Sequence, residues 1–147
     1  MAFEFKAIRR VEFSETDMAG IVHYSNFFRY METAEHGFFR SLGHSVVMDH
    51  FETPMGWPRV HAECVYRHPL RFEDEVEIHL LVKKKKSKAV SYLFKFTKIN
   101  GPKPVEVARG SLVVVCVVKK KDGSLAAAKI PKAVAAKIQV APARLLK

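Results

Sequence analysis

The chain has 147 residues, 48% of them apolar, and eleven are phenylalanine. This length and composition suit a domain with a sizeable hydrophobic core and exclude a disordered chain. Lys and Arg outnumber Asp and Glu by 25 to 15, and the formal charge of +10 favours anionic partners such as nucleic acid, membrane surfaces or phosphorylated small molecules.

No membrane span or secretory signal is expected. No apolar run approaches the roughly 20 residues that cross a bilayer, and the N-terminus lacks a basic start followed by an apolar core. Cys64 and Cys116 lie in strand-like stretches and are expected as free thiols. We therefore expect a single domain over residues 1–147, located in the cytoplasm.

The first element in chain order, Phe3–Phe13, is predicted as a strand. Its apolar positions keep one parity except around residues 7–10, where the slip indicates a bulge. Residues Ser14–Ser25 follow as a loop that carries Asp17 and Gly20.

Residues Asn26–Leu42 are predicted as a helix. Large apolar side chains recur there at helical spacing, at Phe27, Phe28, Met31, Ala34, Phe38, Phe39 and Leu42. Gly43 is well placed to end the helix in a left-handed conformation. Ser25 or Asn26 could cap its start.

The rest of the chain is predicted mainly as strands. Alternating and continuous apolar runs indicate four of them, at Arg59–Arg67, Glu75–Val82, Lys88–Ile99 and Val105–Val118. A short helix opened by Pro131 is expected over Ile130–Ile138. One long apolar helix followed by an antiparallel meander can bury these side chains only if the sheet curls around the helix, which predicts an α+β fold.

The most specific pattern lies between Phe13 and Phe27. An Asp precedes a Gly-hydrophobic-Val step, an aromatic, an Asn and a second aromatic, and the matching residues are Asp17, Gly20, Ile21, Val22, Tyr24, Asn26 and Phe27. This pattern resembles the signature of hotdog-fold acyl-CoA thioesterases, above all the 4-hydroxybenzoyl-CoA thioesterase group and its Tol-Pal-associated relatives. The resemblance covers roughly residues 8–138. It implies a hotdog fold, an antiparallel five-stranded sheet curled around one long central helix, and hydrolysis of acyl-CoA without a cofactor other than the CoA of the substrate.

The resemblance implies catalytic roles for Asp17 and Tyr24. A thioester carbonyl needs a nucleophile or base on one side and charge stabilisation on its oxygen. Asp17 would attack the carbonyl carbon or deprotonate a water, while the backbone N–H of Tyr24 at the helix N-terminus would donate to the carbonyl oxygen. Gly20 would let the backbone pass close to the thioester. Taken alone, Asp17 could instead be a loop residue that caps a turn.

Further substrate-binding positions follow from the same reasoning, namely Val22, His23, Asn26, Glu32, His61 and Glu63. The Tol-Pal-associated branch has Tyr before His, whereas this chain has His23 before Tyr24, so its histidine is displaced by one residue. Either Glu32 or Glu35 could line the acyl pocket or orient a water, or each could be a solvated or interface carboxylate. His61 and Glu63 share one strand face and could reach a substrate near a dimer seam.

Lys83–Lys88 joins two predicted strands and is the longest basic run. Its ammonium groups could bind the 3′-phosphate and diphosphate of CoA, and the resemblance assigns this role to Lys86, Ser87 and Lys88. The alternative is a solvated hairpin whose charges protect a sheet edge.

Other chemistries find less support in the sequence. The seven histidines form no HExxH motif and no zinc-like spacing with cysteine, so no metal site is expected. A hydratase or dehydratase acting on acyl-CoA or acyl carrier protein remains open, although its Asp-x-Asn-Pro-x-His pattern is absent. A non-catalytic basic binding protein also remains open, but the aromatic residues do not interleave with lysines as a nucleic-acid platform would require.

The predicted Arg59–Arg67 strand would lie at an open sheet edge. Pairing with its two-fold mate would extend the sheet and complete the site, so we expect at least a homodimer. The resemblance implies a homotetramer of two dimers. The expected partner is the acyl-CoA substrate, and nucleic acid is not.

Overall fold

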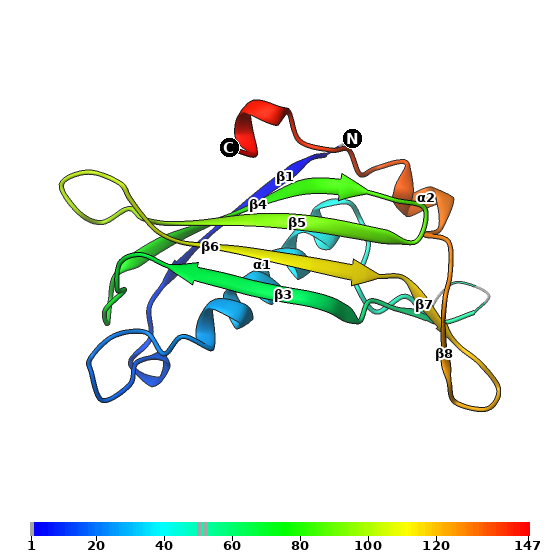
Figure 1. The fold of residues 1–147 in the computed structure, drawn as a ribbon, viewed down its shortest axis with the longest axis horizontal. Helices are drawn as coiled ribbons and strands as arrows, with labels where there is room; N and C mark the ends of the chain where they lie inside the picture. The colour runs from blue at the N-terminus through cyan, green and yellow to red at the C-terminus, as the bar shows by residue number, and fades with distance from the viewer. Residues whose placement is uncertain (1, 50, 52) are drawn as a thin grey trace.

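The computed structural model describes residues 2–49, 51 and 53–147. Its main layer is an antiparallel sheet of five strands in the order β1-β4-β5-β6-β3, and one long helix, α1 (Asn26–Ser41), packs on one face of it (Figure 1). The strands are β1 (Glu4–Arg10), β3 (Arg59–Tyr66), β4 (Glu75–Lys85), β5 (Ala89–Lys98) and β6 (Val105–Val115). This confirms the predicted hotdog architecture and its α+β class.

A second, smaller sheet extends from one end of the molecule. It consists of β2 (Met55–Gly56), β7 (Val117–Lys119) and β8 (Leu125–Ala127), and a short helix, α2 (Lys132–Ala135), follows it. Figure 1 shows this sheet and α2 at the same end as the turn between β4 and β5. The predicted strand Val105–Val118 is therefore two strands, separated at Cys116.

Helix α1 begins and ends close to the predicted bounds. Its buried face includes Phe27, Met31, Ala34, Phe38 and Phe39, which pack against the inward side chains of β4, β5 and β6. The chain leaves the helix at Gly43, whose φ of +84° is the left-handed conformation expected there. Burying this many large side chains on one helix face is the main source of hydrophobic stabilisation.

The first strand differs from its prediction. β1 ends at Arg10, and its pairing with β4 runs from Glu4 opposite Leu81 to Arg10 opposite Glu75 without a register shift, so the expected bulge is wrong. The apparent slip at residues 7–10 arises because Ile8 is 67% exposed, while Arg9 keeps the inward parity of Phe5 and Ala7 and binds Glu15. The strand also ends earlier than predicted. Phe13 lies on a 3-10 turn beyond the strand, is 74% exposed, and meets the ring of Phe72 edge-on.

Gly110 on β6 lies where the Met31 side chain of α1 packs against the sheet. A Cβ at this position would collide with the side-chain sulfur of Met31 and would lie 2.9 Å from its terminal carbon. A glycine here lets the helix sit directly on the sheet. The second turn of α1 is thereby held close to β6.

β3 is an edge strand with an open side. Nearly all of its residues are exposed, including the apolar side chains Val60 (63%), Val65 (55%) and Tyr66 (42%). The apolar alternation that predicted the strand therefore does not reflect burial within one chain. Among the described residues, no helix is both long and apolar enough to cross a bilayer.

Candidate active site

Glu15 is the buried polar centre of the loop before α1. Its carboxylate accepts hydrogen bonds from the guanidinium of Arg9 at 2.6 and 3.2 Å, from the Tyr30 hydroxyl at 3.0 Å and from the backbone N–H of Glu12 at 2.8 Å. Burial favours the neutral acid, but these hydrogen bonds together hold the pKa of Glu15 below its ordinary value. Glu15 is therefore an ionised anchor.

The backbone carbonyl of Glu15 fixes the start of the helix. It accepts the N–H of His23 at 2.9 Å and the side-chain amide of Asn26 at 2.8 Å. Asn26 also accepts a bond from Arg29 at 2.8 Å. One residue thus ties the strand that precedes the loop to the first turn of α1.

Asp17 lies two residues beyond this anchor, at the start of a tight turn. Its N–H donates to the carbonyl of Ile21 at 2.9 Å, and its own carbonyl accepts the N–H of Gly20 at 2.9 Å. One carboxylate oxygen, Oδ1, accepts the N–H of Ala19 at 2.8 Å. Asp17 therefore does cap its own turn, and it is also exposed at the mouth of a pocket.

The N–H of Tyr24 points out of the helix N-terminus. The carbonyl of His23, in the same peptide plane, accepts the N–H of Asn26 at 2.9 Å. In a planar trans peptide the N–H and C=O point in opposite directions, so the Tyr24 N–H faces away from the helix. None of the described residues accepts a hydrogen bond from it. This is the arrangement of a donor available to a ligand.

Asp17 and Tyr24 line one pocket of about 410 Å³. Its walls come from the loop, from the first turn of α1 and from the end of β3, and the lining residues are Asp17, Ile21, Val22, Tyr24, Phe27, Tyr66, Arg67, His68, Pro69 and Leu70. The Tyr66 hydroxyl donates to the carbonyl of Tyr24 at 2.9 Å and so joins two of these walls. A mostly apolar pocket with few polar groups at one side is typical of a small-molecule site.

Of the other loop residues predicted for the site, only Val22 lines this pocket. Gly20 does not: a Cβ there would have no neighbour within 4 Å, and the residue is required for its φ of +78°. His23 hydrogen-bonds Ser25 at 2.8 Å and stacks on the Tyr24 ring. Asn26 is buried and holds the loop. Gly20, His23 and Asn26 thus shape the site from outside the pocket.

The carboxylates and histidine predicted farther along the chain lie elsewhere. Glu32 is exposed on α1. His61 and Glu63 are 3.2 Å apart on the sheet face that turns away from α1, where they line a separate groove with Lys83 and Lys84. Within one chain they do not meet Asp17.

Glu35, the other helix carboxylate, is fully buried rather than solvated. It accepts the guanidinium of Arg59 at 2.6 Å and so fastens the first residue of β3 to α1. Burial outweighs this ion pair and raises the pKa of Glu35.

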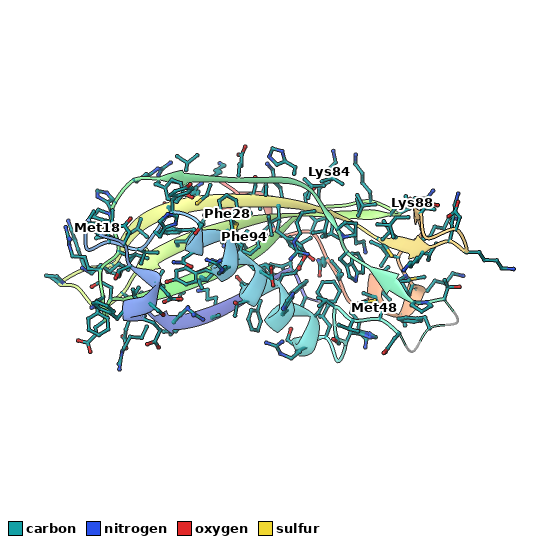
Figure 2. The ribbon with its side chains drawn as sticks, turned by 90° about the horizontal axis from the view of Figure 1, so that it is seen from below. Met18, Phe28, Met48, Lys84, Lys88 and Phe94 are labelled. Atoms are coloured by element: carbon teal, nitrogen blue, oxygen red, sulfur yellow. The ribbon has the colours of Figure 1, made fainter. Side chains whose placement is uncertain are left out.

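Lys86, Ser87 and Lys88 lie at the opposite end of the sheet from Asp17. β4 starts beside the site, since Val11 next to the loop donates to the carbonyl of Asp74, and it runs 11 residues to Lys85. At about 3.4 Å per residue this is about 35 Å. Figure 2 shows Met18, in the Asp17 turn, at one end of the molecule and Lys88 toward the other.

Sequence reasoning missed the pocket residues contributed by the end of β3 and the segment that follows it. Tyr66, Arg67 and His68 come from a region where the sequence shows only a strand end and a Pro, and nothing local indicates that it folds back beside the helix N-terminus. The hydrogen bond from Val22 N–H to the carbonyl of Leu70, 2.8 Å long, makes that connection. In the described part of the chain, no three His, Cys, Asp or Glu side chains gather as a metal site requires, and His50 lies outside the described residues.

Comparison with known proteins places this site in a family context. A family profile described as the thioesterase-like superfamily matches residues 11–138. A protein of Aquifex aeolicus (strain VF5), named "Putative esterase", is 38% identical over 115 residues, which are 76% of this chain and 82% of that protein.

Two solved structures extend the comparison. A gentisyl-coenzyme A thioesterase is 32% identical with a TM-score of 0.74, over 88% of this chain and 98% of its own. The 4-hydroxybenzoyl CoA thioesterase of Pseudomonas sp. strain CBS-3 is 21% identical with a TM-score of 0.80, over 92% and 99%. The second of these, at low identity, shows the shared fold.

Glu15→Gln tests the anchor. Loss of the charge from a buried, hydrogen-bonded carboxylate is expected to lower the free energy of unfolding by about 2–4 kcal/mol at neutral pH. Because the folded pKa of Glu15 is lowered, its contribution is present above the ordinary Glu pKa and disappears as the pH falls through the folded value. Urea unfolding of wild type and variant should therefore converge in acid.

Glu77→Gln is the matched control for this prediction. Glu77 pairs weakly with Lys6, at 3.9 Å, on the sheet surface. Its loss should cost less than about 1 kcal/mol. Equal losses for the two variants, or a Glu15→Gln difference that is unchanged in acid, would contradict the anchor.

Proposed function

The chain belongs to the thioesterase-like superfamily, and from this we propose that it hydrolyses acyl-CoA thioesters with Asp17 as its catalytic carboxylate. The observation that carries the proposal is that Asp17 and Tyr24 line the same apolar pocket, and that no described residue accepts a hydrogen bond from the Tyr24 N–H. A gentisyl-coenzyme A thioesterase at 32% identity supports CoA thioesters as the substrate class.

The proposed chemistry uses groups that belong to the chain. The thioester carbonyl oxygen would accept the Tyr24 N–H at the positive end of α1, which stabilises the negative charge that develops there. In one route Asp17 would attack the carbonyl carbon, CoA would leave as the thiolate, and a water would hydrolyse the mixed anhydride left on Asp17. In the other route Asp17 would deprotonate a water that attacks the carbonyl carbon and displaces CoA directly. Both routes need an ionised carboxylate at this position and no cofactor.

Superfamily membership favours hydrolysis over the two alternatives that the sequence leaves open. The Asp-x-Asn-Pro-x-His pattern of the hydratases is absent from the sequence, and His23, the histidine nearest to Asp17 along the chain, hydrogen-bonds Ser25 outside the pocket. If the protein were only a basic binding surface, nothing would explain the apolar pocket, which lies at the end of the molecule that carries few lysines.

Asp17→Asn should reduce turnover of an acyl-CoA panel, followed by free thiol release, by about 10²-fold or more. Asparagine keeps an acceptor oxygen for the Ala19 N–H, so the turn survives and only the charge is lost.

Asp122→Asn is the matched control, because Asp122 caps an equivalent turn by accepting the Ser124 N–H at 2.9 Å. That variant should retain full activity. An Asp17→Asn protein with unchanged unfolding and at least about a tenth of wild-type turnover would contradict the assignment.

The open edge of β3 supports a homodimer. Val60, Val65 and Tyr66 leave exposed apolar surface on a strand whose outer backbone groups have no partner among the described residues. Natural edge strands usually avoid such surface unless another chain covers it. Antiparallel pairing of β3 with its two-fold mate would extend the sheet and close the pocket wall beside Tyr66.

Replacing Val60 and Val65 together by Lys should therefore give a monomer in light scattering at micromolar concentration, and thioesterase activity should fall. Ile8→Lys on β1, the other edge of the same sheet, is the control, since Ile8 is 67% exposed. The wild type and the Ile8→Lys protein should be dimers, or tetramers built from dimers. A wild-type monomer, or a dimer that survives both changes on β3, would rule out this pairing.

The same pairing gives the distant lysines a role in the neighbouring site. Arg59 lies opposite Val114, Val114 opposite Val90, and Val90 opposite Lys85, so the first residue of β3 is at the lysine end of the sheet. Tyr66, the last residue, is at the pocket end. Antiparallel pairing would bring the lysine end of one chain beside the Asp17 pocket of the other. Lys86, Ser87 and Lys88 would then bind CoA phosphates in trans.

Changing Lys86 and Lys88 together to Ala should raise the Michaelis constant for acyl-CoA several-fold with little change in turnover, because exposed ammonium–phosphate contacts contribute uniform binding. The effect should vanish for acyl-pantetheine, which lacks the phosphates. Lys6→Ala with Lys103→Ala is the charge-matched control and should leave both constants unchanged.

Subunit mixing tests the trans arrangement. Exchange between Asp17→Asn chains and Lys86→Ala/Lys88→Ala chains creates one site with both native parts, so activity at low substrate should exceed that of either parent. Equal losses on acyl-CoA and acyl-pantetheine, or no gain on mixing, would make the lysine run structural.

A further inference from the structure

The entire excess charge of the chain resides in two segments. Residues 83–88 and 119–137 contain eleven lysines, no arginine and one acidic residue, Asp122. The net charge of these two segments is +10, which equals the formal charge of the whole chain, because the remaining residues contain 14 basic and 14 acidic side chains. The molecule is therefore neutral apart from these segments, which we name the lysine-rich end.

The two segments lie together in the fold. The N–H of Ile130 donates to the carbonyl of Ser87 at 2.9 Å, and the ammonium of Lys85 donates to the carbonyls of Ala135 and Ile138 at 3.0 and 2.8 Å. Figure 1 shows the β4–β5 turn, α2 and the β7–β8 hairpin at one end of the molecule. The lysine-rich end is thus one surface.

The charge of this surface is not neutralised from within. Asp122 is used by its own turn, where it accepts the N–H and the hydroxyl of Ser124. Lys85 and Lys137 bind backbone carbonyls. The other nine lysines are exposed, and in the described part of the chain none forms an ion pair with a carboxylate.

We propose that the lysine-rich end docks on the surface of an anionic lipid membrane. Clustered Lys side chains are attracted to anionic headgroups without needing specific geometry. The β7–β8 hairpin adds an apolar element, because Leu125 is 60% exposed and lies opposite Lys119. A lysine cluster with a protruding apolar side chain suits the charged and apolar layers of a membrane interface.

Membrane lipid fits the composition of this surface better than other polyanions. Protein interfaces are depleted in Lys and enriched in Arg and aromatic residues, and this surface has neither. Nucleic-acid surfaces use Arg for base edges and aromatic rings for stacking. CoA has three phosphates, and Lys86 and Lys88 of a neighbouring chain would bind them. CoA binding would therefore leave most of the lysines of this surface without a role. The proposal does not depend on the thioesterase assignment.

Cosedimentation of the full chain with vesicles tests this inference. The wild type should bind vesicles of phosphatidylcholine with phosphatidylserine at low salt and release at high salt, since screening shortens the reach of the charges. It should not bind phosphatidylcholine alone. Changing Lys119, Lys120 and Lys121 together to Gln should lower the partition coefficient at least about ten-fold.

A charge-matched control separates the surface from the net charge. Lys6, Lys103 and Lys147 changed together to Gln remove the same charge elsewhere and should lower the partition coefficient less than about two-fold. Both variants should keep wild-type unfolding and wild-type activity on soluble acyl-CoA.

Any of four outcomes would overturn the proposal. These are no binding to anionic vesicles, equal binding to phosphatidylcholine alone, equal loss in the two triple variants, or release by an oligonucleotide or an acidic polypeptide at the same charge concentration. The last would identify a nucleic-acid or protein surface instead.

Discussion

The site depends on the six hydrogen bonds that Glu15 accepts. Its carboxylate fixes Arg9 and Tyr30, and its carbonyl fixes His23 and Asn26. A buried anion of this kind is stable only while every bond is made, because an unpaired charge in an apolar surrounding is costly. The consequence is geometric: the turn that carries Asp17 and the helix end that presents the Tyr24 N–H are fastened to one residue and cannot drift apart.

Local sequence rules account for most of the fold because they act within single elements. The apolar spacing of α1 and its Gly43 terminus, like the alternation of β4 and β5, reflects contacts between near neighbours or across adjacent strands. The predicted end of the first strand was wrong because it depends on a contact with a distant part of the chain. Phe13 continues the apolar parity of that strand but belongs to the next turn, where Phe72 covers part of it.

The site was harder to predict than the fold because its walls come from distant parts of the chain. The Asp17–Phe27 pattern predicted a carboxylate and a donor, Asp17 and Tyr24, that line one pocket, but a pattern does not say which of its residues face a ligand. Asn26 and Gly20 serve backbone geometry, while Tyr66 and His68 reach the pocket through the tertiary contact between Val22 and Leu70. Such contacts produce no periodicity in the local sequence, so they cannot be predicted from it.

The lysine-rich end and the Asp17 pocket lie at opposite ends of the molecule, and this separation limits how one substrate could contact both. A carboxylate at one end and the lysines at the other, about 35 Å apart along β4, cannot act on one CoA within one chain. Either the lysines serve a different ligand, or two chains share each site. The proposed antiparallel β3 seam would allow both, because it would bring two lysines of one chain to the other chain's pocket and leave the β7–β8 hairpin outside the extended sheet. The proposed use of the lysines in catalysis therefore depends on the open edge of β3, whereas the proposed membrane surface is complete within one chain.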